Sequence, residues 1–393
     1  MAAPWLTVIG IGEDGLAGLP EASRARLGAA EVVFGGARHL ALAGVGAGRA
    51  RRWPVPFDPA PVLAVRGRRV AVLASGDPFW HGAGGSLAAL LDPGEWISLP
   101  APSTFALAAN RLGWRLEETL CLGLHAQPFA RARPHLTRGA RLICLMRDGA
   151  AVADFAAYLG GLGFGASPVA VLERLGGPAE RIRHARADAL PADITAPVAV
   201  ALEVAGAPGL PRGFGLDDDL FAHDGQITRA AIRAVTLCAL APRPGALLWD
   251  IGAGSGSVSV EWCLAGGRAL AVEPRPDRLA HVRRNAEAFG VDHRLTAIAG
   301  RAPEAIAALP APAAVFLGGG ASEAVLAAVW DALPTGGRLV ANAVTLETEA
   351  LLSRWQGARG GRLLRLDLAE AAPLGRLTGW VPQRPVVQWS VTR

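Results

Sequence analysis

Short apolar runs alternate with stretches of helical periodicity along most of the chain. In the second half, runs of buried-strand type occur at 247–251, 269–272, 295–298, 314–317 and 338–341. Helical patterns separate these runs, and such alternation is typical of an α/β domain with a doubly wound parallel sheet. In this architecture, ligands bind at the carboxyl ends of the strands.

The first half is also of α/β type, but its strand ends have a different composition. Apolar runs at 6–9, 70–74 and 97–99 end in the sequences GIGEDG, SGDP and PAPST. Ser103 or Thr104 can cap a helix that runs to Leu112, because both side chains can accept a backbone hydrogen bond. Three strand ends rich in Gly, Asp, Ser and Thr predict a second small-molecule cleft.

A break in the pattern separates the two halves. Residues 206–225 read GAPGLPRGFGLDDDLFAHDG and show no periodicity. Turn residues between two structured blocks indicate a linker. We therefore expect one domain at 1–205, a linker at 206–225 and a second domain at 226–393, which agrees with a chain of 393 residues.

The most informative segment, 245–262, reads GALLWDIGAGSGSVSVEW. Glycines follow the strand at every second position, and a helical pattern begins directly after them. Because glycine lacks a Cβ, such a loop brings backbone N–H groups against a ligand at a helix N-terminus. The predicted cofactor loop consists of Gly252, Ala253, Gly254, Ser255 and Gly256.

Two acidic residues indicate which cofactor the loop binds. Asp250 lies at the strand end, where its carboxylate would repel a diphosphate, and the glycine spacing differs from the dinucleotide pattern G-x-G-x-x-G. Glu273 ends the next strand, where a carboxylate can accept hydrogen bonds from ribose hydroxyls. A ligand with an ammonium and a sulfonium group suits this arrangement, so the pattern predicts an S-adenosylmethionine site.

Composition excludes several kinds of chemistry. The chain has no lysine, so all 39 basic residues are arginine, which excludes Schiff-base lysine catalysis, a pyridoxal phosphate lysine and a P-loop. The four cysteines lack metal-ligand spacing, and we predict no metal site. We also expect no membrane or nucleic-acid partner and a cytoplasmic location, because no basic stripe, signal peptide or span-length apolar segment is present. A homo-oligomer is expected as well.

The motifs of both halves resemble known families. The sequences GIGEDG, SGDP and PAPSTFALAANRLG are similar to those of the tetrapyrrole methylases, and LHAQ at 124–127 and LERLGGPAERI at 172–182 resemble the branch acting at carbon 5. In the second half, QITR at 226–229, the glycine loop, GRAPEA at 300–305 and ANAVTLE at 341–347 resemble the branch acting at carbon 15. A fusion in this order resembles the decarboxylating precorrin-6Y methyltransferase family.

This resemblance implies a bifunctional C-methyltransferase of aerobic cobalamin biosynthesis, which converts precorrin-6Y to precorrin-8X. It implies two S-adenosylmethionine sites, methylation at carbons 5 and 15 and loss of the ring-C acetate carboxyl as carbon dioxide. A tetrapyrrole methylase fold of two α/β subdomains would then precede a Rossmann-like methyltransferase domain. The family's SLHGR loop differs here, since Gly123, Ala126 and Gln127 replace three of its residues.

Site residues follow from these motifs. In the first half we expect cofactor contacts from Gly10, Gly12, Gly76, Asp77, Ser103 and Thr104. In the second half we add Thr228, Arg301 and Ala302 to Asp250, Glu273 and the glycine loop. Arg229, Arg275 and Arg301 are candidates for binding substrate carboxylates, since a guanidinium matches a carboxylate. Among the histidines, only His125 is a candidate near the chemistry, and a structural role is equally open.

Two other functions remain open. An RNA methyltransferase can share both fold types, but the chain lacks a [DNS]-P-P-[YF] motif and has Tyr158 as its single tyrosine for base stacking. A dinucleotide-dependent oxidoreductase could also use a glycine loop, although Asp250 and the glycine spacing disfavour it.

Overall fold

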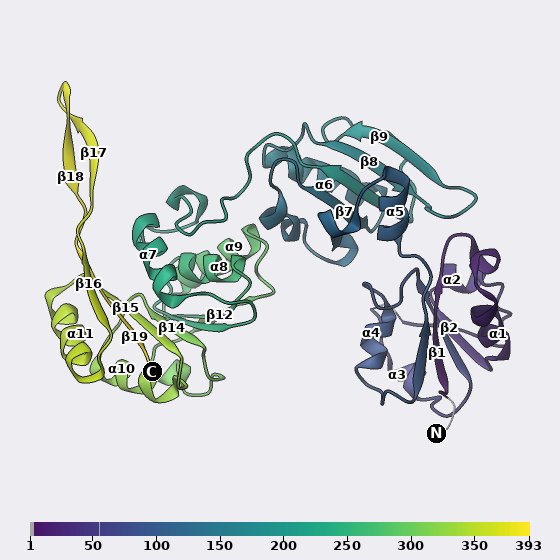
Figure 1. Ribbon diagram of the computed structural model, residues 1–393, viewed down its shortest axis with the longest axis horizontal. Helices are drawn as coiled ribbons and strands as arrows, with labels where there is room; N and C mark the ends of the chain where they lie inside the picture. The colour runs from purple at the N-terminus through teal and green to yellow at the C-terminus, as the bar shows by residue number, and fades with distance from the viewer. Residues whose placement is uncertain (1–3, 55) are drawn as a thin grey trace. The chain divides into compact units, whose positions relative to one another are not determined.

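The computed structural model describes residues 4–54 and 56–393, which form two compact units (Figure 1). Unit 1 comprises the residues up to 129 and 136–208, and unit 2 comprises 130–135 and 209–393. No described helix combines the length and the apolar character needed to cross a bilayer.

The first sheet of unit 1 is entirely parallel, in the order β3-β2-β4-β1-β5. Its strands are β1 (Leu6–Ile11), β2 (Val32–Gly35), β3 (Ala50–Arg52), β4 (Val70–Ser75) and β5 (Trp96–Leu99). The helices along this part are α1 (Glu21–Ala29), α2 (Ala37–Leu42), α3 (Ala60–Leu63) and α4 (Ala83–Ala88). Both faces of the sheet are packed, which explains why β1 and β4 read as continuous apolar runs.

The second sheet of unit 1 is mixed, in the order β6-β7-β10-β8-β9. Its strands are β6 (Thr119–Gly123), β7 (Arg141–Met146), β8 (Pro168–Glu173), β9 (Arg181–Arg186) and β10 (Val198–Glu203). Only β6 and β7 pair in parallel. Helix α5 (Thr104–Leu112) packs on this sheet, and α6 (Gly149–Gly161) follows β7. Ser103 caps α5 by accepting the N–H of Ala106, as the sequence predicted.

Unit 2 is built on a seven-stranded sheet, in the order β13-β12-β11-β14-β15-β19-β16. The parallel strands are β11 (Leu247–Ile251), β12 (Arg268–Glu273), β13 (Leu295–Ala299), β14 (Ala314–Leu317) and β15 (Arg338–Ala343). These confirm the five predicted strands. Strand β19 (Val386–Thr392) is antiparallel to both of its neighbours, β15 and β16 (Arg362–Leu366).

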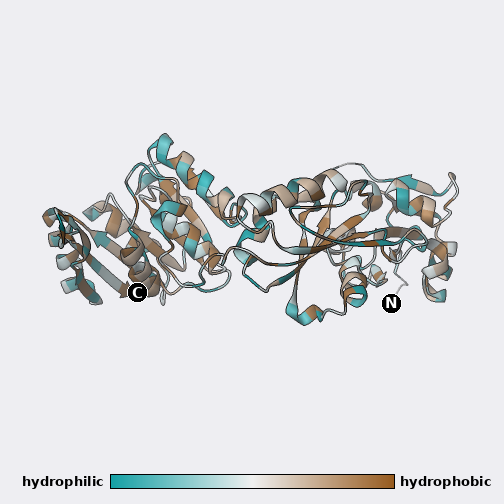
Figure 2. Ribbon diagram, turned by 90° about the horizontal axis from the view of Figure 1, so that it is seen from above, coloured by the Kyte–Doolittle hydropathy of each residue, from teal (hydrophilic) through white to brown (hydrophobic). Residues whose placement is uncertain are grey.

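Helices cover both faces of this sheet. They are α7 (Ala230–Leu240), α8 (Ser257–Leu264), α9 (Pro276–Ala288), α10 (Glu323–Ala332) and α11 (Leu346–Arg359). Leu248 joins the core on one face, whereas its neighbours Trp249 and Ile251 join the core on the other. Hydrophobic residues concentrate along the strands in Figure 2. The doubly wound architecture predicted from the pattern is therefore present.

A two-stranded hairpin, β17 (Ala369–Leu374) and β18 (Leu377–Pro382), extends from unit 2 between β16 and β19 (Figure 1). Its large apolar side chains, such as Leu377 and Trp380, are exposed. The hydrophobic pattern did not predict this hairpin, because neither of its faces packs against a core.

The segment predicted as a linker is partly built into unit 2. Leu216 and Phe221 are buried in its core, and Phe221 stacks on Phe289 with ring centroids 4.8 Å apart. The contacts divide the chain between Pro208 and Gly209. Sequence periodicity misses such a segment, because it packs as irregular backbone with single apolar residues.

Candidate active sites

The larger cavity, of about 1130 Å³, lies at the carboxyl ends of the parallel strands in unit 2. Its wall includes residues that directly follow β11, β12, β13 and β14, together with Asn342 on β15. Parallel strands place their carboxyl ends at one edge of a sheet, so motifs far apart in the sequence meet here. Predicted residues in this wall are Thr228, Gly252, Ala253, Gly254, Glu273, Arg301 and Ala302.

The three loop glycines have left-handed backbone conformations but different surroundings. Their φ angles are 70° at Gly252, 58° at Gly254 and 74° at Gly256. A Cβ on Gly252 would lie 2.7 Å from the carbonyl oxygen of Gly319, so this glycine is required by packing. A Cβ on Gly254 would meet only the carbonyl of Gln226, at 3.3 Å, and Gly254 lines the cavity. Gly254 therefore leaves open space in the cavity that a ligand can occupy.

Glu273 is a buried carboxylate at the end of β12 that holds the loop in place. One oxygen accepts the N–H of Gly254 at 2.9 Å, and the other accepts the N–H of Arg275 at 3.0 Å. A carboxylate oxygen accepts more than one hydrogen bond. Glu273 therefore fixes the glycine loop and retains acceptor capacity on its cavity side.

Three predicted cofactor residues, Asp250, Ser255 and Gly256, are not among those that line the cavity. Asp250 is fully buried, and one of its oxygens accepts a hydrogen bond from Ser259 on α8 at 2.6 Å. Burial raises the pKa of Asp250 to about 6, although the hydrogen bonds of Ser259 oppose this effect. The other oxygen has no partner among the described residues. In this structure, Asp250 joins β11 to α8 beneath the loop.

Two of the predicted substrate arginines, Arg229 and Arg275, lie in the cavity wall and are already engaged with an aspartate. Arg229 lies 3.3 Å from Asp218, and Arg275 lies 2.6 Å from Asp277. The hydrogen bond to Asp277 raises the pKa of Arg275. The charge of each guanidinium is therefore partly compensated within the protein.

A buried arginine that the sequence did not point to, Arg233, holds the segment 215–228 in place beside the cavity. Arg233 on α7 is fully buried, and its Nε lies 2.5 Å from Glu261 on α8. Glu261 also accepts the N–H groups of Gly215 and Leu216, while Arg233 donates to the carbonyls of Leu216 and Thr228. The pair thus anchors 215–228 and positions Thr228. No local motif reveals it, because its partners lie far apart in the sequence.

In unit 1, three strand ends meet at a cavity of about 460 Å³. The N–H of Gly76 donates to the carbonyl of Ile11, and the N–H of Ala101 donates to the carbonyl of Gly76, both at 3.1 Å. A Cβ on Gly10 would collide with the carbonyl of Gly76. Glycine at position 10 therefore allows the predicted turns after β1, β4 and β5 to converge.

Most of the predicted unit 1 residues line this cavity. They are Gly12, Gly76, Ser103, Thr104 and His125. Gly10 and Asp77 do not line it, and Asp77 instead accepts the N–H of Phe79 at 2.9 Å within the turn. Burial lowers the pKa of His125, and the charge of His81 acts in the same direction. A cavity histidine of this kind is neutral at pH 7.

A polar cluster in the same wall had no motif to signal it. Arg38 and His39 both contact the hydroxyl of Ser75, at 2.9 and 2.8 Å, and Arg38 pairs with Glu13. Burial and the charge of Arg38 lower the pKa of His39 to about 4. The cluster joins α2 to the turns after β1 and β4.

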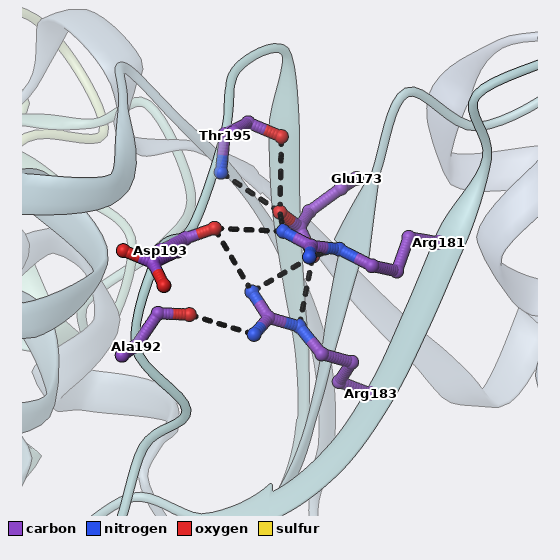
Figure 3. Close-up of polar contacts among 6 residues, drawn as sticks. All are labelled: Glu173, Arg181, Arg183, Ala192, Asp193 and Thr195. Atoms are coloured by element: carbon purple, nitrogen blue, oxygen red, sulfur yellow. Dashed lines mark hydrogen bonds and ion pairs between the residues drawn. The ribbon is translucent and has the colours of Figure 1, made fainter.

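Glu173 and Arg181 of the LERLGGPAERI motif belong to an ion-pair network that also includes Arg183 (Figure 3). Glu173 is fully buried and accepts hydrogen bonds from Arg181, Arg183 and Thr195 at 2.6–3.1 Å. Burial alone would raise the pKa of Glu173, but these hydrogen bonds and the charge of Arg183 outweigh it and lower the pKa to about 2. The network ties β8, β9 and the 192–195 loop together, next to cavity residue Leu172.

Comparisons with known proteins agree with this arrangement. Residues 6–191 match the family model of tetrapyrrole (corrin/porphyrin) methylases, and residues 219–393 match that of the precorrin methyltransferase domain. A solved structure, the C-terminal domain of precorrin-6Y C5,15-methyltransferase from Rhodobacter capsulatus, is 55% identical. It covers 47% of this chain and 100% of its own, with a TM-score of 0.46.

Two curated relatives match over the whole chain, and both are named precorrin-6Y C(5,15)-methyltransferase [decarboxylating]. The protein from Sinorhizobium sp is 49% identical over 100% of this chain and 97% of its own length. The protein from Mycobacterium tuberculosis is 43% identical over 99% of this chain and 100% of its own. These matches decide among the three functions that the sequence left open. The chain belongs to the family of decarboxylating precorrin-6Y C(5,15)-methyltransferases of cobalamin biosynthesis.

Proposed function

We propose that the chain binds two molecules of S-adenosylmethionine, one in each unit, and methylates precorrin-6Y twice. Unit 1 would methylate carbon 5, and unit 2 would methylate carbon 15 with loss of the ring-C acetate carboxyl as carbon dioxide. The names of the full-length relatives and the two separate cavities support this assignment.

The glycine loop of unit 2 carries the proposal. A Cβ at Gly254 would project into the space that the cofactor would occupy, and Glu273 reaches the N–H of the same glycine. This combination of an open backbone and an adjacent carboxylate fits a cofactor with ribose hydroxyls and a positive charge. In unit 1, the converging turns at Gly12, Gly76 and Ser103 would hold the second molecule.

When bound, S-adenosylmethionine supplies an electrophilic methyl group. An electron-rich tetrapyrrole carbon needs no activated nucleophile from the protein, so the residues in the wall mainly position the substrate and exclude water. The described lining of the unit 2 cavity contains no cysteine or histidine, which agrees with this role. In unit 1, the neutral ring of His125 is the candidate group that contacts the reacting carbon or accepts its proton.

Three experiments test the proposal. Calorimetry with S-adenosylhomocysteine should give a stoichiometry of two per chain, and a value of one in fully folded protein would contradict the two-site model. Mass spectrometry of precorrin-6Y incubated with enzyme and S-adenosylmethionine should show two methyl additions and one loss of carbon dioxide. A His125→Asn variant should retain the carbon-15 methylation and the decarboxylation while losing carbon-5 methylation.

A further inference from the structure

Arginines line the unit 2 cavity at several points, and they differ in whether the protein already pairs their charge. They are Arg229, Arg275, Arg278, Arg301 and Arg384. The first two are paired as described above, and Arg278 lies 3.0 Å from Asp224. A guanidinium with a carboxylate partner has less to offer a ligand, because it must first give up part of that contact.

Arg301 and Arg384 are different. Within the described parts of the chain, neither side chain makes an ion pair or a hydrogen bond, and both residues are exposed in the cavity wall. Because both guanidinium groups are exposed to water, each is stable without a carboxylate partner in the protein. It leaves each planar set of donors available for a carboxylate, which it can bind through two parallel hydrogen bonds.

The two arginines lie at separate places along the sheet. Arg301 lies two residues after the end of β13, and Arg384 lies two residues before the start of β19, five strand positions away. Adjacent strands lie about 4.8 Å apart, so these strand ends are separated by roughly 24 Å. One carboxylate cannot bind both side chains at their strand ends. A ligand that uses both must be large and carry at least two carboxylates on different sides.

Acidic residues restrict how such a ligand can lie. Asp217 and Asp219 also line the cavity, and neither forms an ion pair with another described residue. Their charges would repel carboxylates from that part of the wall. In addition, an arginine bound to the departing acetate would stabilise the charge that must be lost. The arginines are therefore suited to carboxylates that remain on the product.

We propose that Arg301 and Arg384 bind two peripheral carboxylates of the tetrapyrrole and thereby set its orientation in unit 2, which assigns Arg301 to the substrate rather than to the cofactor. This inference rests on the proposed function of that unit. It also assigns a substrate role to the base of the hairpin, since Arg384 lies between β18 and β19, beside the bond from Gln383 to Glu370.

The test uses the full chain with Arg301→Gln and Arg384→Gln, and Arg365→Gln as the matched control. Arg365 is an exposed arginine of β16 that pairs with Asp367 and does not line the cavity. Each cavity variant should raise KM for the tetrapyrrole roughly 10-fold or more at the carbon-15 step, the effect of losing a charged hydrogen bond. The affinity for S-adenosylhomocysteine, kcat and the melting temperature should remain as in the unmodified protein. Lysine in place of either arginine should restore part of the loss, because it keeps the charge but not the fork.

The outcomes separate this inference from the function on which it rests. An unchanged KM in both variants, with normal methyl transfer by the unmodified chain, would overturn the inference and leave the function intact. A loss of S-adenosylhomocysteine binding in Arg301→Gln would reassign Arg301 to the cofactor and overturn its substrate role. If the unmodified chain transfers no methyl group to a tetrapyrrole, both fail together.

Discussion

The replacement of Gly254 by valine tests the cofactor loop most directly. Gly254 has a φ of 58°, and an added Cβ would meet only the carbonyl of Gln226, at 3.3 Å. The side chain would therefore extend into the cavity rather than into the core. We expect Gly254→Val to abolish cofactor binding in unit 2 while the unit stays folded.

The stability cost can be worked from the backbone. A left-handed conformation costs an L-residue about 1–2 kcal/mol. For a unit of this size, each kcal/mol lowers the melting temperature by about 2–4 °C, so the unit should melt about 2–8 °C lower. Gly245 offers a matched control, because its φ is 76° and its Cβ would meet nothing within 4 Å. Gly245→Val should destabilise unit 2 by the same amount but leave cofactor binding unchanged.

Calorimetry with S-adenosylhomocysteine and scanning calorimetry provide the assay. Binding should fall from two sites to one in Gly254→Val and stay at two in Gly245→Val. With substrate, Gly254→Val should give a singly methylated tetrapyrrole that retains its acetate. If this variant keeps both sites and forms the doubly methylated product, the loop is not the cofactor site and the reasoning fails.

Three further predictions concern stability. Burial raises the pKa of Asp250 to about 6, so the folded protein holds the Asp250 proton more tightly than the unfolded chain does. The free energy of unfolding should therefore fall by about 3 kcal/mol as the pH rises from 4 to 6. Asp250→Asn should remove this fall when unfolding is measured against pH. The pKa of Glu173 is lowered to about 2, so the stability that ionised Glu173 gives to unit 1 is present above pH 4.5 and is lost as the pH falls toward 2. Glu173→Gln should destabilise unit 1 by about 1.5–3 kcal/mol in denaturant titrations at pH 7, with no change in unit 2. A fragment that begins at Gly209 should be about 3–6 kcal/mol more stable than one that begins at Gln226, since the shorter fragment lacks two buried apolar side chains; equal stability would show that 209–225 is a free linker.

Local pattern predicted the five parallel strands of unit 2 and the glycine loop after β11, because a buried parallel strand is continuously apolar and a close backbone approach needs glycine. Strands β11 and β14 have exactly the bounds expected from their apolar runs. The pattern could not predict the partner of Asp250, since whether a strand-end carboxylate faces a ligand or a helix depends on how α8 packs. The same limit applies to Arg233 and to the Arg38–His39 cluster, whose partners come from distant segments.

The position of β19 has a consequence for synthesis of the chain. This strand lies between β15 and β16 in the sheet but follows both along the chain, and β16 has no other described sheet partner. Unit 1 can complete both of its sheets once β10 has emerged from the ribosome. Strand β15 ends at Ala343 and β19 begins at Val386, 43 residues later, so at roughly 5–20 residues per second the edge of β15 stays unpaired for about 2–9 s. During this interval the edge of β15 is open and its apolar neighbours are uncovered, which is the state most prone to aggregation. Translation that stops or pauses before residue 386 would therefore leave a folded unit 1 joined to an incomplete and aggregation-prone unit 2.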